Sequence, residues 1–212
     1  MITTFSAILS DLDGVLVDSG EAIEAAWGAW ARGHDLDPGV LDGRIHGVRT
    51  LDVIRAVAPR LDVVAEAAAV EDLVLHGPAA TVLAGAAELL GGAAGVPVAV
   101  VTSCPGVLAQ RRLRDAELPA PAVLVTADRV GAGKPDPEGY RLAAAELGVA
   151  PERCVVFEDA PAGIAAGRAA GASVIAIATT HRREELSLAD AIVGSVAEAL
   201  ELVASGVLQP QL

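Results

Sequence analysis

The sequence predicts an α/β fold in which a doubly wound parallel sheet is interrupted, after its first strand, by a small inserted helical cap domain. Short, near-continuous apolar runs alternate with Ala-rich stretches of helical periodicity, as expected for parallel strands that are buried on both faces. One interval, from about residue 19 to 83, has helical periodicity and no convincing strand. We therefore expect a Rossmann-like core formed by residues 1–16 and 84–212, with a cap formed by residues 17–83.

The core elements follow one another in the order that such a sheet requires. Its predicted strands are the apolar runs at residues 5–9, 98–101, 122–125, 154–157, 174–177 and 191–193. Its predicted helices lie between them, at about residues 106–116, 137–147, 161–170 and 195–204. Pro137 and Pro161 suit a first helical turn, and Ser195 can cap the last helix. Strands joined in this way give right-handed crossovers and a parallel sheet.

Three further helices are predicted in the cap. The first opens after Asp18, which together with Glu21 resembles a capping box, and it continues to Arg32. Trp27 and Trp30 lie three residues apart in this helix, and we expect them to form the core of the cap. The other two helices are expected at residues 49–58 and 61–75. A helical block at this point of the chain would cover the carboxyl edge of the sheet, where open α/β sheets bind ligands.

The composition bounds the class of protein. Of the 212 residues, 53% are hydrophobic and only 20% are charged, which excludes a disordered chain, and with 2% aromatics the core must be built from Val, Leu, Ile and Ala. The net charge of −13 argues against a nucleic-acid partner. Every apolar run is interrupted before the roughly 20 residues that a membrane span needs, and no signal peptide is recognised. We expect a cytoplasmic protein, either a monomer or a weak homodimer.

Two cysteines, Cys104 and Cys154, lie beside apolar strand-like runs. In a chain of this length they are no disulfide framework, and a free Cys in such a position usually behaves as a small core residue. The alternative is a reactive thiol at Cys104.

Polar side chains that carry chemistry follow four of the predicted strands. Asp11 and Asp13 come directly after the first strand, before a turn at Gly14; Thr102 and Ser103 end the second; Lys134 lies in a Gly-rich loop after the third; and Glu158 and Asp159 end the fourth. These strand ends face one edge of a parallel sheet. Acids, one Lys and hydroxyls together suit a hard cation such as Mg²⁺ and a phosphoryl group.

These segments resemble, in order and spacing, the four motifs of the haloacid dehalogenase superfamily of phosphatases. The matching positions are residues 11–19, Thr102, Lys134 and residues 158–163, so the resemblance spans nearly the whole chain. The interrupting helices look like the small helical cap of that superfamily. Residues 45–54 resemble the cap segment of its sugar and polyol phosphatases, which include the hexitol type.

The resemblance implies a role for each matching residue. Asp11 would attack the phosphoryl group and become an aspartyl phosphate, and Asp13 would protonate the leaving alcohol and then deprotonate the attacking water. Thr102 and Lys134 would hold the phosphoryl oxygens. Mg²⁺ would be bound by Asp11, Asp13 (through its carbonyl), Asp159 and Glu158. The candidate substrate contacts are Ser103, His46, Gly47, Arg49, Thr50 and Glu21.

The predicted function is a Mg²⁺-dependent phosphatase of small phosphorylated sugars or polyols. A phosphosugar mutase resembling β-phosphoglucomutase is one alternative, although such mutases usually carry a His where Ile23 and Ala26 stand. A catalytically silent binding protein is another. A receiver domain also uses an Asp, a Thr and a Lys around Mg²⁺, but it has about 120 residues and no helical insertion. Val15, where relatives commonly carry Thr, shapes the turn rather than reacting.

Overall fold

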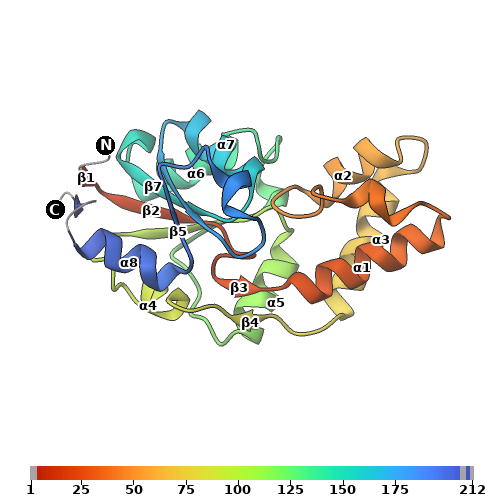
Figure 1. The fold of residues 1–212 in the computed structure, drawn as a ribbon, viewed down its shortest axis with the longest axis horizontal. Coiled ribbons are helices and arrows are strands. Elements are labelled where there is room, and N and C mark those ends of the chain that lie inside the picture. Colours follow the sequence, from red (N-terminus) through yellow and green to blue (C-terminus); the bar gives the residue numbers. More distant parts are fainter. Residues whose placement is uncertain (1–3, 206–208, 211–212) are drawn as a thin grey trace.

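The core of the computed structural model, which describes residues 4–205 and 209–210, is a parallel sheet of six strands (Figure 1). The strands are β2 (Ala7–Ser10), β5 (Val98–Val101), β6 (Val123–Val125), β7 (Cys154–Glu158), β8 (Ser173–Ile177) and β9 (Ala191–Val193). They lie in the order β6-β5-β2-β7-β8-β9. Counted along the chain this is the order 3-2-1-4-5-6 of a doubly wound sheet, which confirms the predicted fold class.

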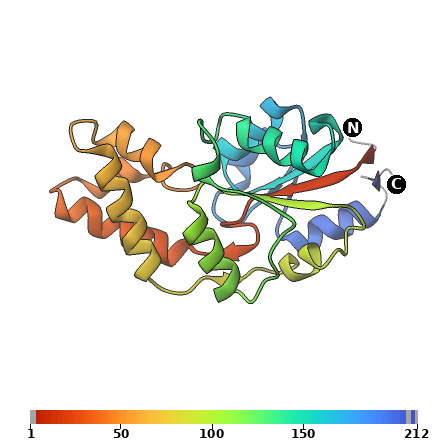
Figure 2. The same ribbon diagram turned by 180° about the vertical axis from the view of Figure 1, so that it is seen from behind.

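Helices cover both faces of this sheet (Figures 1 and 2). The helices α6 (Glu138–Leu147) and α7 (Pro161–Ala170) pack on one face, and α4 (Ala86–Leu90), α5 (Gly106–Asp115) and α8 (Val196–Ala204) lie on the other. In β2, Ala7 and Leu9 point towards α6 and α7 while Ile8 points to the opposite layer. All three are fully buried. Burial on both faces explains why the central strands read as unbroken apolar runs.

Two of the three predicted start signals of the core helices are confirmed, those at Pro161 and Ser195. Pro161 is the first residue of α7, and the Ser195 side chain caps α8 by accepting a hydrogen bond from the Glu198 N–H at 3.2 Å. Pro137 is the residue that immediately precedes α6.

The cap consists of α1 (Gly20–Gly33), α2 (Thr50–Val57) and α3 (Val63–His76), and it stands at one end of the molecule (Figure 1). Trp27 and Trp30 are buried and meet edge to face, with 5.5 Å between ring centroids, as expected for the core of the cap. The two segments that connect the core and the cap run side by side, because β3 (Val17–Asp18) pairs antiparallel with β4 (Thr81–Val82). The boundaries at residues 16/17 and 83/84 stay a prediction.

The predicted capping box at the start of α1 is wrong. Ser19, not Asp18, precedes the helix, and its side chain makes no capping bond. Its hydroxyl instead donates to Asp13 Oδ1 at 2.6 Å. Asp18 accepts from the Gly20 N–H at 3.1 Å, and Glu21 is exposed. The hydroxyl that would have capped the helix therefore serves the predicted site.

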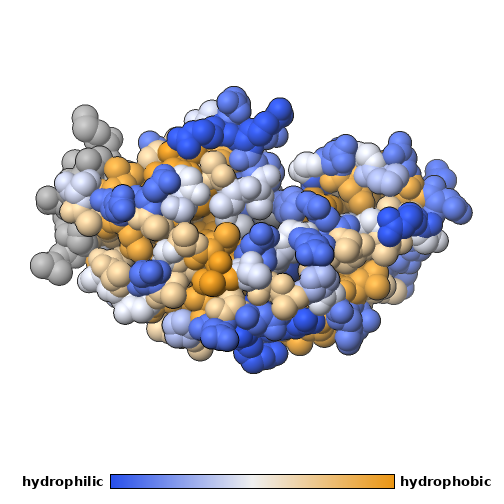
Figure 3. Space-filling view, turned by 60° about the horizontal axis from the view of Figure 1, so that its bottom comes forward, coloured by the Kyte–Doolittle hydropathy of each residue, from blue (hydrophilic) through white to orange (hydrophobic). Residues whose placement is uncertain are grey.

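Short elements complete the described chain. β1 (Thr4–Phe5) pairs parallel with β10 (Gln209–Pro210). Four short 3₁₀ helices lie at Pro38–Leu41, Ala127–Arg129, Pro151–Arg153 and Arg183–Leu186. Among the described residues, none of the helices has the length and apolarity that crossing a bilayer requires. Figure 3 shows hydrophilic and hydrophobic residues interspersed over one face, with an indentation in its outline between core and cap.

Candidate active site

The residues predicted from the four strand ends meet at the carboxyl edge of the sheet, beside β2. Asp11 follows β2, Thr102 follows β5, and Glu158 and Asp159 lie at the end of β7. Lys134 lies in the segment between β6 and α6, just before α6 begins. The chain order of the strands reverses between β2 and β7, and ligands bind at this point in doubly wound sheets.

Lys134 is the central cation of this edge. Its ammonium lies 3.0 Å from Asp11 Oδ2 and donates to Glu158 Oε1 at 2.5 Å and to the Val101 carbonyl at 3.3 Å. Three acceptors therefore match its three protons. Burial alone would lower the pKa of Lys134, but attraction to Asp11 and Glu158 outweighs it and the pKa is raised. Lys134 is a permanent positive charge beside Asp11.

Glu158 is buried and accepts hydrogen bonds on both oxygens. Oε1 accepts from Lys134 and from the Tyr140 hydroxyl at 2.8 Å, and Oε2 accepts from the backbone N–H groups of Asp159 and Ala160 at 3.0 and 3.1 Å. An added Cβ at Gly163 would collide with this carboxylate, so a glycine is required there. Four donors fill the acceptor capacity of a carboxylate, so Glu158 is positioned to anchor Lys134.

Asp159 is the carboxylate that lacks a full set of partners. Oδ2 accepts from the Thr180 hydroxyl, whereas Oδ1 is buried and unpaired within the described residues. Burial, reinforced by repulsion from Glu158 and Asp11, raises the pKa of Asp159 well above its usual value. Gly14, at φ +74°, leaves the room that Asp159 needs, because a Cβ there would overlap Oδ2.

The donor set fits a hard divalent cation. Asp11, Glu158 and Asp159 have carboxylate oxygens within 4.8 Å of one another. Because Glu158 already accepts four hydrogen bonds, Asp11 and Asp159 are the two of these acids that can bind a cation directly. Burial also raises the pKa of Asp11 well above its usual value, against the attraction of Lys134. Buried carboxylates with raised pKa and one orphaned oxygen are what a bound cation would stabilise in their ionised form.

Asp13 is held from three directions. Ser19 donates to Oδ1, and Arg112 Nη1 lies 2.6 Å from Oδ2. The Thr102 hydroxyl lies 3.3 Å from Oδ2. The side chain of Asp13 is 21% exposed, whereas Arg112 is buried. A carboxylate at the mouth of the site is thus tied to a cation from α5.

At this edge of the sheet, acidic side chains outnumber basic ones by two. The acids Asp11, Asp13, Glu158 and Asp159 face the cations Lys134 and Arg112. When all four carboxylates are ionised, two negative charges have no protein partner. A divalent cation would neutralise them.

Above this edge lies a cleft that core and cap enclose together. Predicted substrate contacts that line it are His46, Gly47, Thr50 and Ser103. Ser103 donates to the Gly47 carbonyl at 2.9 Å, so the cap touches the core here. Burial, together with nearby His181, lowers the pKa of His46. Much of the remaining cap wall is apolar, formed by Ile23, Trp27, Ile45, Val48, Val70 and Val74.

Two predicted substrate contacts lie outside this cleft. Arg49 pairs with Asp52 at 2.7 Å and donates to the carbonyls of Val130 and Gly131 at 3.4 and 3.1 Å. It therefore ties the start of α2 to a core loop, and the anion that its place at a helix start suggested is Asp52. Glu21 is exposed and is not among the lining residues.

Sequence reasoning missed four residues that the structure adds to this region. The Thr180 hydroxyl donates to Asp159, and the Tyr140 hydroxyl donates to Glu158. Thr180 could have been found from the sequence, because it follows β8 in the same way as the other polar groups follow their strands. Glu71 of α3 lines the cleft and is half-buried, and this burial raises its pKa. Arg112 falls on the buried stripe of α5, where a charged residue is itself a signal.

A doubly wound sheet with a nucleophile-like Asp, an ion-paired Lys and a carboxylate cluster at its switch point, under a helical cap, defines a hydrolase of the haloacid dehalogenase type. The family model for haloacid dehalogenase-like hydrolases matches residues 5–171. The chain belongs to this family, which confirms the resemblance stated above.

Individual relatives give the same result. The chain is 46% identical to hexitol phosphatase A of Escherichia coli over 85% of its own length and 88% of the relative's. It is 39% identical to validoxylamine A 7'-phosphate phosphatase of Streptomyces hygroscopicus, over 92% and 95% of the two chains. Its fold is similar to the crystal structure of CbbY from Rhodobacter sphaeroides in complex with phosphate, with a TM-score of 0.76 and 26% identity over 92% and 96% of the chains.

Proposed function

We propose that this protein is a phosphatase that hydrolyses small phosphorylated sugars or polyols through an aspartyl phosphate on Asp11. The observation that carries the proposal is the buried cluster of Asp11, Lys134 and Asp159, with Lys134 3.0 Å from Asp11 and one oxygen of Asp159 unpaired. The named relatives act on hexitol phosphates and on validoxylamine A 7'-phosphate, both hydroxyl-rich phosphate esters.

The residues divide the reaction between them. An Asp11 oxygen forms a bond to phosphorus as the bond to the sugar oxygen breaks, and Asp13 gives its proton to that leaving oxygen. Water then attacks the aspartyl phosphate while Asp13 accepts a proton, so Asp11 is regenerated and phosphate leaves. Thr102 and Lys134 would hold the phosphoryl oxygens, Lys134 by turning the proton that now reaches the Val101 carbonyl at 3.3 Å, and Lys134 offsets the negative charge that Asp11 brings to a dianionic ester.

We assign Mg²⁺ as the cation that balances the two negative charges for which the site has no basic partner. Asp159 and Asp11, with the Asp13 carbonyl, would hold it, and Glu158 would support them by fixing Lys134. When bound, Mg²⁺ would screen the phosphoryl oxygens from the carboxylates.

The cleft supports a hydroxyl-bearing substrate. Its cap wall combines apolar surface with the polar groups of His46, Thr50 and Glu71. An acidic side chain in this wall can accept hydrogen bonds from substrate hydroxyls, and it would repel a second phosphate. The cytoplasmic location and the monomeric or weakly dimeric state stay predictions.

Phosphate release tests the proposal. We expect the protein with Mg²⁺ to release phosphate from a panel containing sorbitol 6-phosphate, glycerol 1-phosphate and 2-deoxyglucose 6-phosphate. Asp11→Asn should lower kcat by about three orders of magnitude or more, because the amide is not a nucleophile. Asp72→Asn, which changes an exposed acid of the cap, is the matched control and should retain activity.

Two outcomes would contradict the proposal. Full turnover by Asp11→Asn would remove Asp11 as the nucleophile. Isomeric sugar phosphates formed without free phosphate would select the mutase alternative, which Ile23 in the cleft disfavours because it offers no group for proton transfer.

A further inference from the structure

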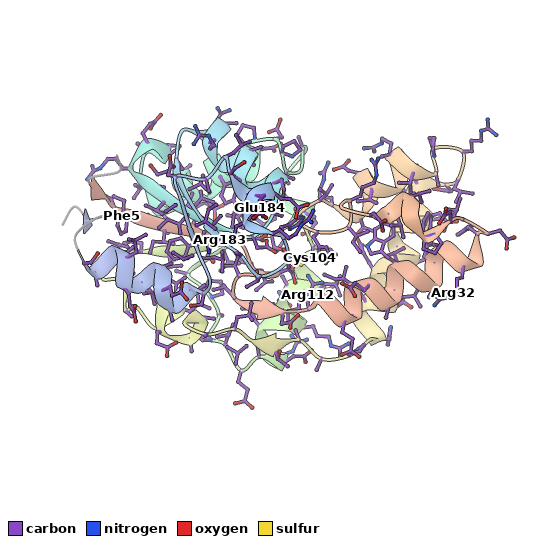
Figure 4. The ribbon with its side chains drawn as sticks, in the orientation of Figure 1. Phe5, Arg32, Cys104, Arg112, Arg183 and Glu184 are labelled. Atoms are coloured by element: carbon purple, nitrogen blue, oxygen red, sulfur yellow. The ribbon has the colours of Figure 1, made fainter. Side chains whose placement is uncertain are left out.

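Arg112 is a buried cation that has no role in the reaction proposed above. It lies in α5 on the same stripe as Leu108, Ala109 and Leu113, which pack into the core. Its side chain is 7% exposed. Figure 4 shows Arg112 together with Cys104 near the junction of core and cap. A guanidinium in such a place needs an acidic partner, since an unpaired buried charge is strongly destabilising.

The partner is Asp13. Arg112 Nη1 donates to Asp13 Oδ2 at 2.6 Å, a short, charge-assisted contact. Ser19 holds the other oxygen at 2.6 Å. The carboxylate is therefore fixed at both ends, by the start of the cap on one side and by a core helix on the other.

We propose that Arg112 is a positioning residue that fixes the orientation of the Asp13 carboxylate for proton exchange with the leaving oxygen. Without Arg112, Oδ2 would keep only the longer 3.3 Å contact with the Thr102 hydroxyl, which also lies 3.3 Å from Cys104 Sγ, so Ser19 would be the one short contact left on the carboxylate. Arg112 holds Oδ2 from a rigid helix, and its own side chain is locked by burial. A proton donor must lie within hydrogen-bond reach of the leaving oxygen, so a loss of orientation lowers the rate of the step that it serves.

This inference rests on the proposed role of Asp13, and the choice of leaving group isolates that role. An alkoxide leaving group must be protonated as its bond to phosphorus breaks, whereas 4-nitrophenolate leaves without help. The kcat/KM value reports the steps up to the first phosphoryl transfer, so later attack by water does not obscure the comparison.

The experiment compares kcat/KM for glycerol 1-phosphate and for 4-nitrophenyl phosphate. Arg112→Met should lower the value for the alkyl ester roughly 100-fold and the value for the aryl ester only a few-fold. Arg112→Lys keeps the charge and should retain part of the activity on the alkyl ester. Arg114→Met, an exposed position of the same helix, is the matched control and should change neither value. Equal losses on both esters, or no loss on either, would overturn the proposal.

A second measurement needs no substrate. In a crystal structure of Arg112→Met, the Asp13 carboxylate should leave its present orientation, whereas an unchanged Asp13 would show that Arg112 does not position it. If the wild-type protein hydrolyses neither ester, the proposed function fails, while the orientation of Asp13 still decides the role of Arg112.

Discussion

The two walls of the cleft hold their polar groups in different ways. The core wall includes Asp11 and Asp159, and behind them Lys134 has an acceptor for each of its protons and Glu158 accepts four hydrogen bonds. On the cap wall, His46, Thr50 and Glu71 stand among apolar side chains. The core wall therefore fixes one arrangement of charge, which any phosphate ester needs, while the cap wall offers a few polar groups that can distinguish one ester from another.

The largest expected effect concerns the metal on the core wall. Burial raises the pKa of Asp11 and of Asp159 in the folded protein. Without metal, the stability that their protonated forms provide is complete below the unfolded value of about 4 and is lost as the pH rises through the raised values. Mg²⁺ should therefore raise the Tm more at about pH 8 than at about pH 5. At about pH 8 the rise should be roughly 5–10 °C when Mg²⁺ is present at about 100 times its Kd.

Differential scanning fluorimetry with millimolar Mg²⁺ or with EDTA measures this difference, and phosphate release should be lost in EDTA. Asp159→Asn should abolish the shift and, without metal at about pH 8, should be at least as stable as the wild type, since a buried charge is removed. Asp72→Asn should keep the shift. The same Tm with Mg²⁺ and with EDTA at both pH values would exclude the assigned metal site.

The sequence could predict the core wall because topology alone brings its residues together. Asp11, Thr102 and Asp159 follow strands of a parallel sheet, so their meeting depends on strand direction rather than on any particular side-chain contact. Thr180 follows the same rule after β8. The six strands were predictable for a related reason, since burial on both faces leaves an unbroken apolar run.

The cap wall could not be predicted in this way. Which residues of a helix face the cleft depends on how the cap sits on the core, and periodicity does not determine that orientation. Glu71 was missed for this reason, and Arg49 was assigned to the substrate although Asp52, three residues on, offers it a local partner. Arg112 depends on a contact between positions 99 residues apart in the chain.

A smaller effect, on KM, is expected on the cap wall. Glu71→Gln removes the charge of a cleft-lining acceptor without changing its size, so KM for sorbitol 6-phosphate should rise roughly 5- to 20-fold with kcat retained. KM for 4-nitrophenyl phosphate, which has no hydroxyls to bind, should change little.

Arg49→Ala provides the contrast, because Arg49 ties the cap to the carbonyls of Val130 and Gly131 without lining the cleft. Its loss should affect all esters alike. If Glu71→Gln changed both KM values equally, or Arg49→Ala were selective for sorbitol 6-phosphate, the assignment of selection to Glu71 would be wrong.

The smallest effect tests how closed the core wall is at Cys104, which lines the cleft yet is buried and lies 3.3 Å from the Thr102 hydroxyl. Burial raises the pKa of its thiol to about 12. At about pH 8 only about one thiol in 10⁴ is then ionised, and the thiolate is the form that reacts with iodoacetamide.

Mass spectrometry should therefore find Cys104 unlabelled in the native protein and labelled after denaturation. Cys154, also buried and with a pKa of about 11, is the internal reference away from the cleft. Rapid labelling of Cys104 while Cys154 stays protected would show that the core wall opens to solvent, and the contrast between a fixed core wall and a selective cap wall would then no longer hold.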